Sequence, residues 1–461
     1  MNVSQNKKIR LPAKASLFYL LAIIGSRAIG ILTTPLFTRA MSPEEYGSYS
    51  YYISVLSISS MLSGVFLTPA VFYSGLGKFS ENRKEFANTG IILSSAVNLL
   101  ICIVLFAFSG FFGITKQIAI IIFLQGFVDS IVTAELLRSK FSYGYPRVIA
   151  INLSSAILGA LISLCLVFSF DLGAMGRILG LLISGAIIAS VLLLRKGERP
   201  EISLDGGRFL LKNAPPLIPA VIARASVGFL DKLIIKSNLG ASALAKYSVA
   251  HTVGTALLAL IGALSSALNP WIIRKLRQGE ENTVFSVVDE LSAIISWGSV
   301  TILALAPEIF SFLAPKSYGD ALYVIAPLAV SATPYFLFSI LSVLAGFRER
   351  TRLISASTLA GAAVSIGLNL ILIPRIGILG GGIAYLAAET VMYLSSFIIL
   401  REHGRESSML GIKPEVFISL GIGGLLILLY GRLPLRIFLL IIPAVMAVKH
   451  GFTCLDLAKE K

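Results

Sequence analysis

Ionisable side chains inside long apolar runs are the residues of this sequence that could do chemistry. Arg27 and Arg224 each lie in the middle of such a run, and Asp231 and Lys232 follow in the second run. An ionised group at the middle of a bilayer costs at least about 2.5–3.5 kcal/mol, so each one needs a partner or an aqueous cavity. A guanidinium stays charged at physiological pH, and its paired donors match phosphate oxygens. We therefore expect Arg27, Arg224 and Lys232 to bind an anionic ligand.

Acidic residues in the apolar runs point to a second kind of chemistry. Asp129, Asp231 and Glu389 are candidates for ion coupling or for lining a cavity, since a desolvated carboxylate exchanges protons nearer neutral pH. The coupled ion would be H⁺ or Na⁺. The structural alternative is that each arginine pairs with an acidic residue such as Asp129 or Glu389 and holds two helices together.

Helical spacing constrains the charged residues that follow Arg224. Asp231 and Lys232 are adjacent, hence about 100° apart on a helix, so they cannot both face one small site. Arg224, Gly228 and Asp231 share a helical face and are expected to form one polar stripe. The alternative for Asp231 and Lys232 is a charge pair near the outer rim of the membrane.

Several polar residues have plainer explanations. Glu135 lies three residues before Arg138 and is expected to pair with it at a helix end, whereas His251 is expected to be a packed or pore-lining group. Gly377 and the glycines at 380–382 mimic a nucleotide-binding loop. No strand precedes them, so a tight turn with close helix packing is expected instead.

The elements that carry these residues are predicted from hydropathy. The chain has 461 residues, 56% of them hydrophobic and 14% charged, and a mean hydropathy of +0.85, which excludes an ordinary soluble protein. Its apolar runs are long enough to cross a hydrocarbon core about 30 Å thick, and they must be helical because lipid offers the backbone no partners. We predict an all-α membrane protein of about 14 transmembrane helices. The spans are 16–38, 48–72, 88–110, 117–137, 146–169, 177–194, 214–236, 247–273, 284–306, 323–346, 354–374, 378–400, 415–430 and 434–450.

The last two spans are short, so a re-entrant pair and a total of twelve are the alternative. The first run is interpreted as a retained helix rather than a cleaved signal peptide, because no small-residue cleavage site follows it. The three cysteines are isolated, which argues against a disulfide framework or a metal site.

Basic residues give the spans an orientation. With a cytoplasmic N-terminus, 27 of the 39 Lys and Arg residues fall in cytoplasmic segments and 9 in outer loops. This excess predicts an inner-membrane protein with both termini in the cytoplasm. It also accounts for the net charge of +15 without nucleic acid, because the basic residues are spread over short segments.

The first twelve spans divide into two similar halves. Arg27 and Arg224 are 197 residues apart, and Tyr49 and Tyr247, each followed by Ser, are 198 apart. Both halves start on the same side, which predicts a parallel repeat with a site between two lobes. The expected domains are an N-terminal lobe at 1–200, a C-terminal lobe at 201–404, and a helix pair with a cytoplasmic tail at 405–461.

Two segments carry a family resemblance. The segment from Arg27 to Tyr52, which contains PLFTRAMSPEEYGSYSYY, and the segment 229–250, FLDKLIIKSNLGASALAKYSVA, resemble polysaccharide flippases of the Wzx type. The resemblance implies two pseudo-symmetric six-helix lobes around a central cavity, sometimes with two extra C-terminal helices. It implies a flippase that moves undecaprenyl-pyrophosphate-linked oligosaccharide, such as O-antigen or capsule units, to the periplasm. It also draws attention to Asp231 and Lys232, since relatives often carry an Asp-Arg or Asp-Lys pair there.

Competing functions are less well supported. Neither a P-loop, an HExxH motif nor a His/Cys cluster occurs, so no cofactor and no metal are expected, and the chain is not expected to be an enzyme. A membrane glycan polymerase or ligase would need a larger outer loop. A multidrug extruder would be expected to favour acidic and aromatic lining over arginines. A lipid II-type flippase is the nearest rival. Expected partners are the lipid-linked oligosaccharide, membrane lipids, and a polysaccharide polymerase with its chain-length proteins.

Overall fold

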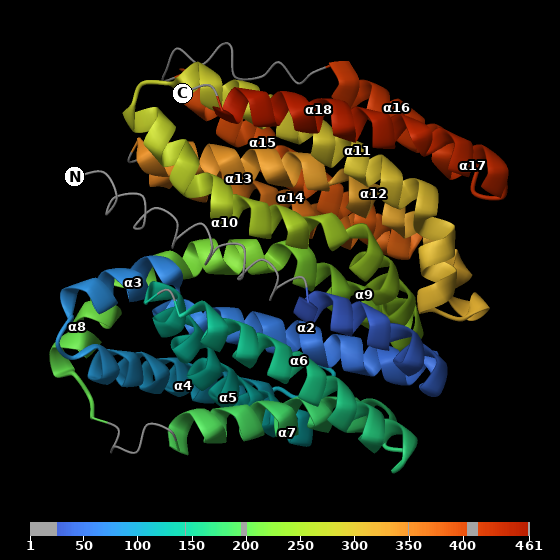
Figure 1. Cartoon of the computed structure of the whole chain (residues 1–461). Coiled ribbons are helices and arrows are strands. Elements are labelled where there is room, and N and C mark those ends of the chain that lie inside the picture. Colours follow the sequence, from blue (N-terminus) through green and yellow to red (C-terminus); the bar gives the residue numbers. More distant parts are fainter. Residues whose placement is uncertain (1–24, 143, 195–200, 349, 403–413, 460–461) are drawn as a thin grey trace. The chain divides into compact units, whose positions relative to one another are not determined.

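The protein folds into helices joined by short connections. The computed structural model describes residues 25–142, 144–194, 201–348, 350–402 and 414–459 (Figure 1). Within these ranges every regular element is a helix and no strand occurs, so the all-α prediction is confirmed. The chain forms two compact units. Unit 1 comprises Met1–Ala225 with Gly240–Ser242, and unit 2 comprises Ser226–Leu239 with Ala243–Lys461.

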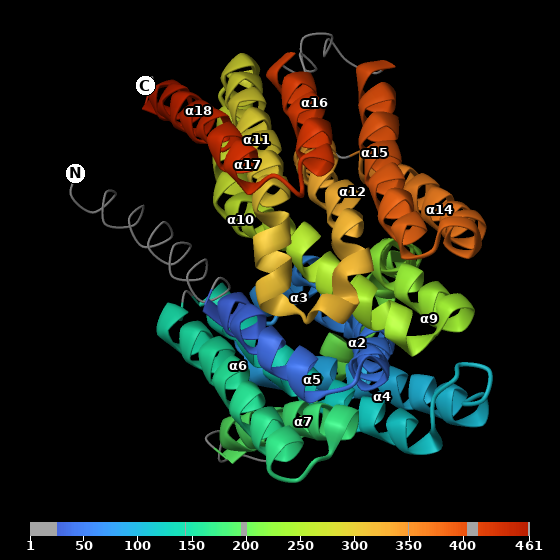
Figure 2. The ribbon, with the colours of Figure 1, turned by 90° about the vertical axis from the view of Figure 1, so that its right-hand side faces the viewer.

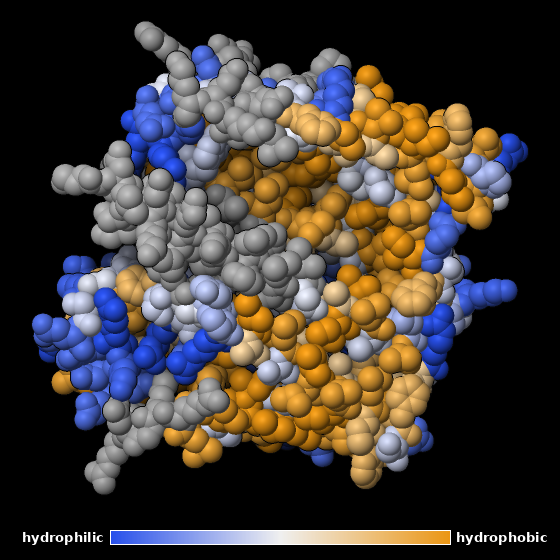
Figure 3. All heavy atoms as spheres, in the orientation of Figure 1, coloured by the Kyte–Doolittle hydropathy of each residue, from blue (hydrophilic) through white to orange (hydrophobic). Residues whose placement is uncertain are grey.

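Ten helical segments of the described residues are long and apolar enough to cross a membrane. In each unit the exposed faces of the helices are apolar along their middles and hydrophilic near their ends (Figure 3). Every predicted span from 48–72 onward is mostly helical, and the first is described from residue 25, where 25–40 are helical. The predicted spans 214–236, 247–273 and 415–430 are not among the ten segments, and Glu415–Leu428 is a shorter apolar helix. The ten segments are Pro43–Lys78, Arg83–Ala107, Lys116–Phe141, Tyr145–Phe168, Gly173–Leu194, Glu281–Leu313, Lys316–Phe347, Ile354–Ile376, Ile378–Leu400 and Leu433–Cys454.

Unit 1 begins its described part with the helix at 25–40. After it come α2 (Pro43–Ser63), a short 3₁₀ turn, α3 (Pro69–Lys78), α4 (Arg83–Ala107), α5 (Lys116–Phe141), α6 (Tyr145–Phe168), α7 (Gly173–Leu194) and α8 (Leu204–Asn213). The start of α2 is set by a capping box. The Ser42 hydroxyl accepts from the Glu45 amide at 3.2 Å, and the Glu45 carboxylate accepts from the Ser42 amide at 2.9 Å.

The core of unit 1 lies where α3, α4, α5 and α8 meet. Phe86 of α4 is fully buried there, with the Phe79 ring stacked 5.3 Å away and the Phe72 ring 5.4 Å away. A Cβ on Gly75 would lie 2.0 Å from the Phe86 ring, so only glycine lets α3 approach α4 this closely. Aromatic pairs of this kind add about 0.5–1.5 kcal/mol each to the energy of burial.

Unit 2 contains most of α9 (Ile218–Gly254) and every later helix. These are α10 (Ala256–Arg277), α11 (Glu281–Leu313), a 3₁₀ segment (Lys316–Val324), α12 (Ile325–Val330), α13 (Ala332–Phe347), α14 (Thr351–Ile376), α15 (Ile378–Glu402), α16 (Pro414–Leu428), α17 (Leu433–Leu439) and α18 (Ile441–Lys459). Gly377, at φ +66°, joins α14 to α15, and a Cβ on Gly380 would lie 2.6 Å from the Leu372 backbone. The expected tight glycine turn with close helix packing is confirmed.

The predicted boundary between spans at 214–236 and 247–273 falls inside α9. The Tyr247 hydroxyl nevertheless bonds the Asp231 carboxylate, whereas 16 residues of straight helix would separate the two by about 24 Å. The chain therefore turns back between them. Gly240, at φ +86°, supplies a conformation that residues with a Cβ rarely adopt.

The C-terminal helices pack on α11 (Figure 2). Arg436 of α17 is 3% exposed, and its two terminal nitrogens donate to Glu308 of α11 at 2.8 and 2.7 Å. Nearer the other end of α11, His450 of α18 bonds Glu290 at 2.6 Å, with both side chains buried. These two pairs, one toward each end of α11, thus hold α17 and α18 against α11.

Candidate functional site

Asp231 of α9 is the centre of a buried polar cluster. Its side chain is 2% exposed, and its carboxylate accepts a hydrogen bond from the Tyr247 hydroxyl. The carboxylate also accepts from the backbone amide of Lys232 at 2.8 Å. Two donors therefore stabilise a charge that burial alone would strongly disfavour.

The rings of His251 and Tyr385 form a layer that covers this cluster. The His251 ring lies 5.8 Å from the Tyr247 ring and, edge to face, 5.8 Å from the Tyr385 ring of α15. His251 Nε2 is buried and has no hydrogen-bond partner among the described residues. His251 is thus a packed polar group, as the sequence led us to expect. The sequence did not reveal Tyr385, because its contact with α9 depends on tertiary packing.

Lys232 lies beside an aromatic ring of its own helix. Its ammonium lies 5.4 Å from the centre of the Phe229 ring and forms no ion pair with Asp231 in the part of the chain that is described. This agrees with the 100° separation expected of adjacent helical residues. Lys232 is therefore a cation of α9 that forms no short ion pair with Asp231, although the two charges are close enough to interact.

The two arginines have different surroundings. Arg27 is exposed on the helix at 25–40, whereas Arg224 of α9 is half-buried. The expected polar stripe of Arg224, Gly228 and Asp231 is wrong in its geometry. Gly228 has a φ of +114°, so the regular 100° rotation per residue does not carry across it.

Asp129 of α5 has a local partner. Its carboxylate accepts from Gln125 Nε2 at 2.9 Å, one helical turn away, and the side chain is half-buried. Tyr52 of α2 is 1% exposed and close enough to interact with the Asp129 charge. Among the described residues Asp129 forms no ion pair with an arginine, so the structural alternative does not explain this carboxylate.

Glu389 is the most deeply buried carboxylate among the described residues of unit 2. It lies in the middle of α15 with an exposed fraction of 0%. Tyr385 is four residues earlier on the same helix and therefore on the same face. This spacing connects Glu389 to the layer that covers Asp231.

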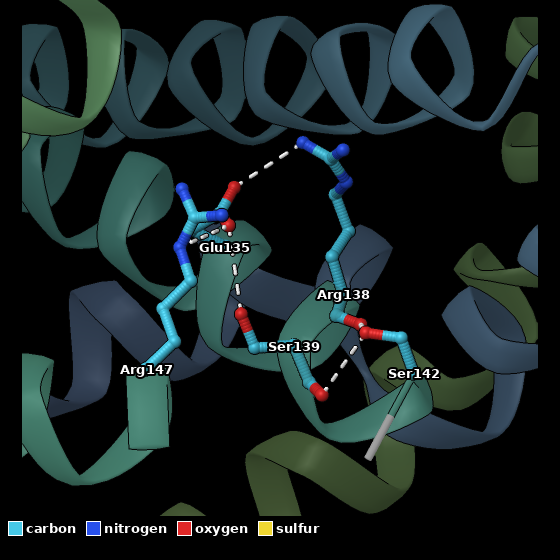
Figure 4. A network of polar contacts seen from close by, with 5 residues as sticks. All are labelled: Glu135, Arg138, Ser139, Ser142 and Arg147. Carbon is cyan, nitrogen blue, oxygen red and sulfur yellow. Dashed lines mark hydrogen bonds and ion pairs between the residues drawn. The ribbon is translucent and has the colours of Figure 1, made fainter. Parts of the chain in front are cut away.

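Glu135 is a structural ion-pair residue (Figure 4). Its carboxylate, 4% exposed, accepts from Arg138 Nη1 at 3.2 Å and from Arg147 Nε of α6 at 3.0 Å. The predicted pair with Arg138 is confirmed. The second arginine was not anticipated, and it ties α5 to α6.

Arg177 is a buried cation that the sequence did not single out. It is 9% exposed at the start of α7, and its guanidinium carbon lies 3.9 Å from the centre of the Phe37 ring and 4.0 Å from that of Tyr49. The Tyr46 ring is 5.2 Å away. Three rings thus stabilise the charge by cation–π interaction. Tyr46 and Tyr49, in the segment from Arg27 to Tyr52, were the residues in the sequence that could have indicated an aromatic site for this cation.

Comparisons with known proteins agree with this architecture. The family model described as "Polysaccharide biosynthesis protein" matches residues 13–276. The Haemophilus influenzae protein named "Lsg locus putative protein 1" is 23% identical over 346 residues, which are 71% of this chain and 80% of that protein. An "Uncharacterized membrane protein" of the same organism is 22% identical over 317 residues, 66% of this chain and 74% of its own.

Solved structures share the fold. The lipid II flippase MurJ in an inward closed conformation superimposes with a TM-score of 0.72 and 16% identity, over 96% of this chain and 100% of that chain. An inward-facing multidrug resistance transporter of the MATE family and MOP superfamily gives a TM-score of 0.67 and 13% identity, over 84% and 94%. Identities this low establish the fold alone. The predicted resemblance and fold class are confirmed by the family match and by these superpositions.

Proposed function

Because this chain belongs to the polysaccharide biosynthesis protein family, we propose that it flips undecaprenyl-pyrophosphate-linked oligosaccharide repeat units across the inner membrane. Transport runs from the cytoplasmic to the periplasmic leaflet by alternating access. The cargo is a unit of O-antigen, capsule or exopolysaccharide. Both termini lie in the cytoplasm, in keeping with the distribution of Lys and Arg.

The observation that carries this proposal is the set of cations in membrane segments. The Lys232 ammonium lies beside the Phe229 ring, and the Asp231 carboxylate accepts from Tyr247 and from a backbone amide. Arg224 adds a guanidinium group on α9, the helix that carries Lys232, and Arg27 adds one on the helix at 25–40. A pyrophosphate brings negative charge into a region of low dielectric, where cationic donors stabilise it most. We assign these three residues to the anionic cargo.

Ion coupling is the second part of the proposal. Asp231 and Asp129 are carboxylates on helices whose described partners are hydroxyl and amide groups, and Glu389 is a carboxylate with an exposed fraction of 0% in the middle of α15. Such groups are typical of proton and cation relays in transporters. We propose that Asp231 and Glu389 bind the coupling ion in unit 2 and that Asp129 does so in unit 1.

Other functions of this fold make different demands. A lipid II-type flippase also needs cations for a pyrophosphate, and its fold is shared, so the glycan is what distinguishes it. A multidrug extruder would export cations, which Arg27, Arg224 and Lys232 disfavour. A polymerase or ligase would need an outer domain, whereas the connection from α11 to α12 is the short segment Lys316–Val324. A polysaccharide polymerase and chain-length proteins are the proposed partners.

Deletion of the gene tests the proposal. We expect surface polysaccharide to disappear and lipid-linked repeat units to accumulate in the cytoplasmic leaflet. Complementation with wild-type protein should restore export, whereas R224A at equal membrane abundance should not. Normal polysaccharide with a loss of drug tolerance would contradict the proposal and favour an extruder.

A further inference from the structure

A row of buried polar side chains follows one face of α15. Tyr385, Glu389, Tyr393 and Ser396 are spaced by four, four and three residues, which places them on one side of a helix. Their exposed fractions are 5%, 0%, 4% and 1%. At 1.5 Å per residue the row is about 16 Å long, which is roughly half of the hydrocarbon core.

The facing helix α14 adds polar groups beside this row. Ser357 and Asn369 are buried on α14, and the Asn369 amide donates to Ser365 at 3.3 Å. The two helices are antiparallel and in close contact, because a Cβ on Gly361 would lie 2.3 Å from Met392. Ser357 therefore lies toward the Ser396 end of the row.

Several polar atoms along the two helices lack partners. Tyr393 Oη, Ser396 Oγ, Ser357 Oγ and Asn369 Oδ1 are buried without a hydrogen-bond partner among the described residues. A buried polar atom left unsatisfied costs about 1–3 kcal/mol, and such atoms in native proteins are almost always bonded to protein or water. Buried water typically joins two to four such atoms. These four atoms, two on each helix, are therefore candidate partners for bound water.

Both ends of the row meet other ionisable groups. At one end the Tyr385 ring is edge-on to His251, which covers the pair of Asp231 and Tyr247. Toward the other end, one turn before Ser396, Tyr393 is close enough to Asp289 of α11 for their charges to interact. Asp289 lies in the first turns of α11, at the end that the positive-inside pattern predicts to be cytoplasmic.

We propose that a file of water molecules along this face of α15, beside Ser357 and Asn369 of α14, conducts protons between Asp289 and Glu389. Each oxygen in the file accepts a proton from one neighbour and passes another to the next. For each proton that leaves the cytoplasmic solvent, one proton arrives on the Glu389 carboxylate. When Glu389 is deprotonated, a proton moves along the file in the opposite direction. The proposal rests on the coupling role of Glu389 for its purpose, but the water can be detected without transport.

X-ray radiolytic footprinting of the full chain in nanodiscs tests the hydration. Hydroxyl radicals made from water oxidise the side chains beside that water. Tyr393 should be oxidised several-fold faster than Phe336, which is 0% exposed on α13, and nearly as fast as the exposed Tyr323. Equal protection of Tyr393 and Phe336 would overturn the water file.

A double variant tests what the file does. S357A/S396A removes two of the partnerless hydroxyls, and we expect slower oxidation of Tyr393 and several-fold lower glycan export. S395A is the matched control, because the Ser395 hydroxyl already bonds Val391 at 2.6 Å. Reduced oxidation with undiminished export would overturn proton conduction. Failure of the proposed function would look different, since wild-type protein would then export no glycan.

Discussion

The Tyr247 hydroxyl donates a hydrogen bond to the Asp231 carboxylate, although 16 residues separate the two along α9. The bond requires the chain to reverse at Gly240, and it leaves the Lys232 ammonium beside Phe229. This one interaction thus joins the two parts of α9 on either side of Gly240.

Removing the Tyr247 hydroxyl tests this relationship. Y247F leaves the buried carboxylate with one fewer donor, so we expect a loss of about 1–3 kcal/mol in stability and weaker glycan export. Thermal denaturation in detergent and surface polysaccharide are the measurements. Y323F is the control, since Tyr323 is 53% exposed. Equal midpoints for Y247F and Y323F would show that the bond contributes nothing.

Arg177 should be sensitive even to replacement by lysine. R177A removes a guanidinium stacked on Phe37 and Tyr49, at a cost of about 1–2 kcal/mol. R177K should recover only part of the loss, because an ammonium does not stack as a planar guanidinium does. Melting midpoints compared with that of R375A, at an exposed position, provide the test. An R177A variant with an unchanged melting midpoint would contradict stabilisation by the rings around Arg177.

The C-terminal helices should loosen when Arg436 is removed. R436A leaves Glu308 without its paired donors and frees the Ala304 carbonyl, which accepts from Arg436 at 2.7 Å. Since Glu308 is 42% exposed, we expect a moderate loss of about 1–3 kcal/mol. Limited proteolysis should then cut around α16 to α18 before the rest of unit 2. R432A, at an exposed arginine, should not change the pattern, and identical cleavage of both variants would refute the role.

Replacing Glu135 should destabilise the protein more than replacing Arg147. E135A leaves Arg138 and Arg147 without their shared acceptor, whereas R147A leaves the pair of Glu135 and Arg138 intact. We therefore expect E135A to lower the melting midpoint more than R147A does, by up to about 1 kcal/mol in stability, because both arginines are partly exposed. The opposite order would contradict the network.

Local patterns in the sequence predicted much of the fold. Long apolar runs predicted the helices, because membrane backbones must satisfy their own hydrogen bonds. The spacing of Glu135 and Arg138 predicted their pair, since residues three apart meet on a helix. Gly377 was correctly predicted to lie in a turn, because a turn is also a local feature of the sequence.

Other features depend on contacts between distant residues. Arg436 meets Glu308 across 128 residues, and no local spacing announces that pair. The stripe through Gly228 failed because helical periodicity assumes regular backbone angles, and only the structure reveals a φ of +114°. The assignment of Arg27, Arg224 and Lys232 to the cargo stays a prediction.

Flipping by the purified protein tests the central claim most directly. Proteoliposomes would hold undecaprenyl-pyrophosphate-linked oligosaccharide with a fluorophore on its glycan, and a membrane-impermeant reductant would quench the outer leaflet. With wild-type protein, the inner-leaflet signal should also be lost over time, and R27A and R224A should slow that loss strongly. An inner-leaflet signal that stays protected with wild-type protein, as in empty liposomes, would contradict the account.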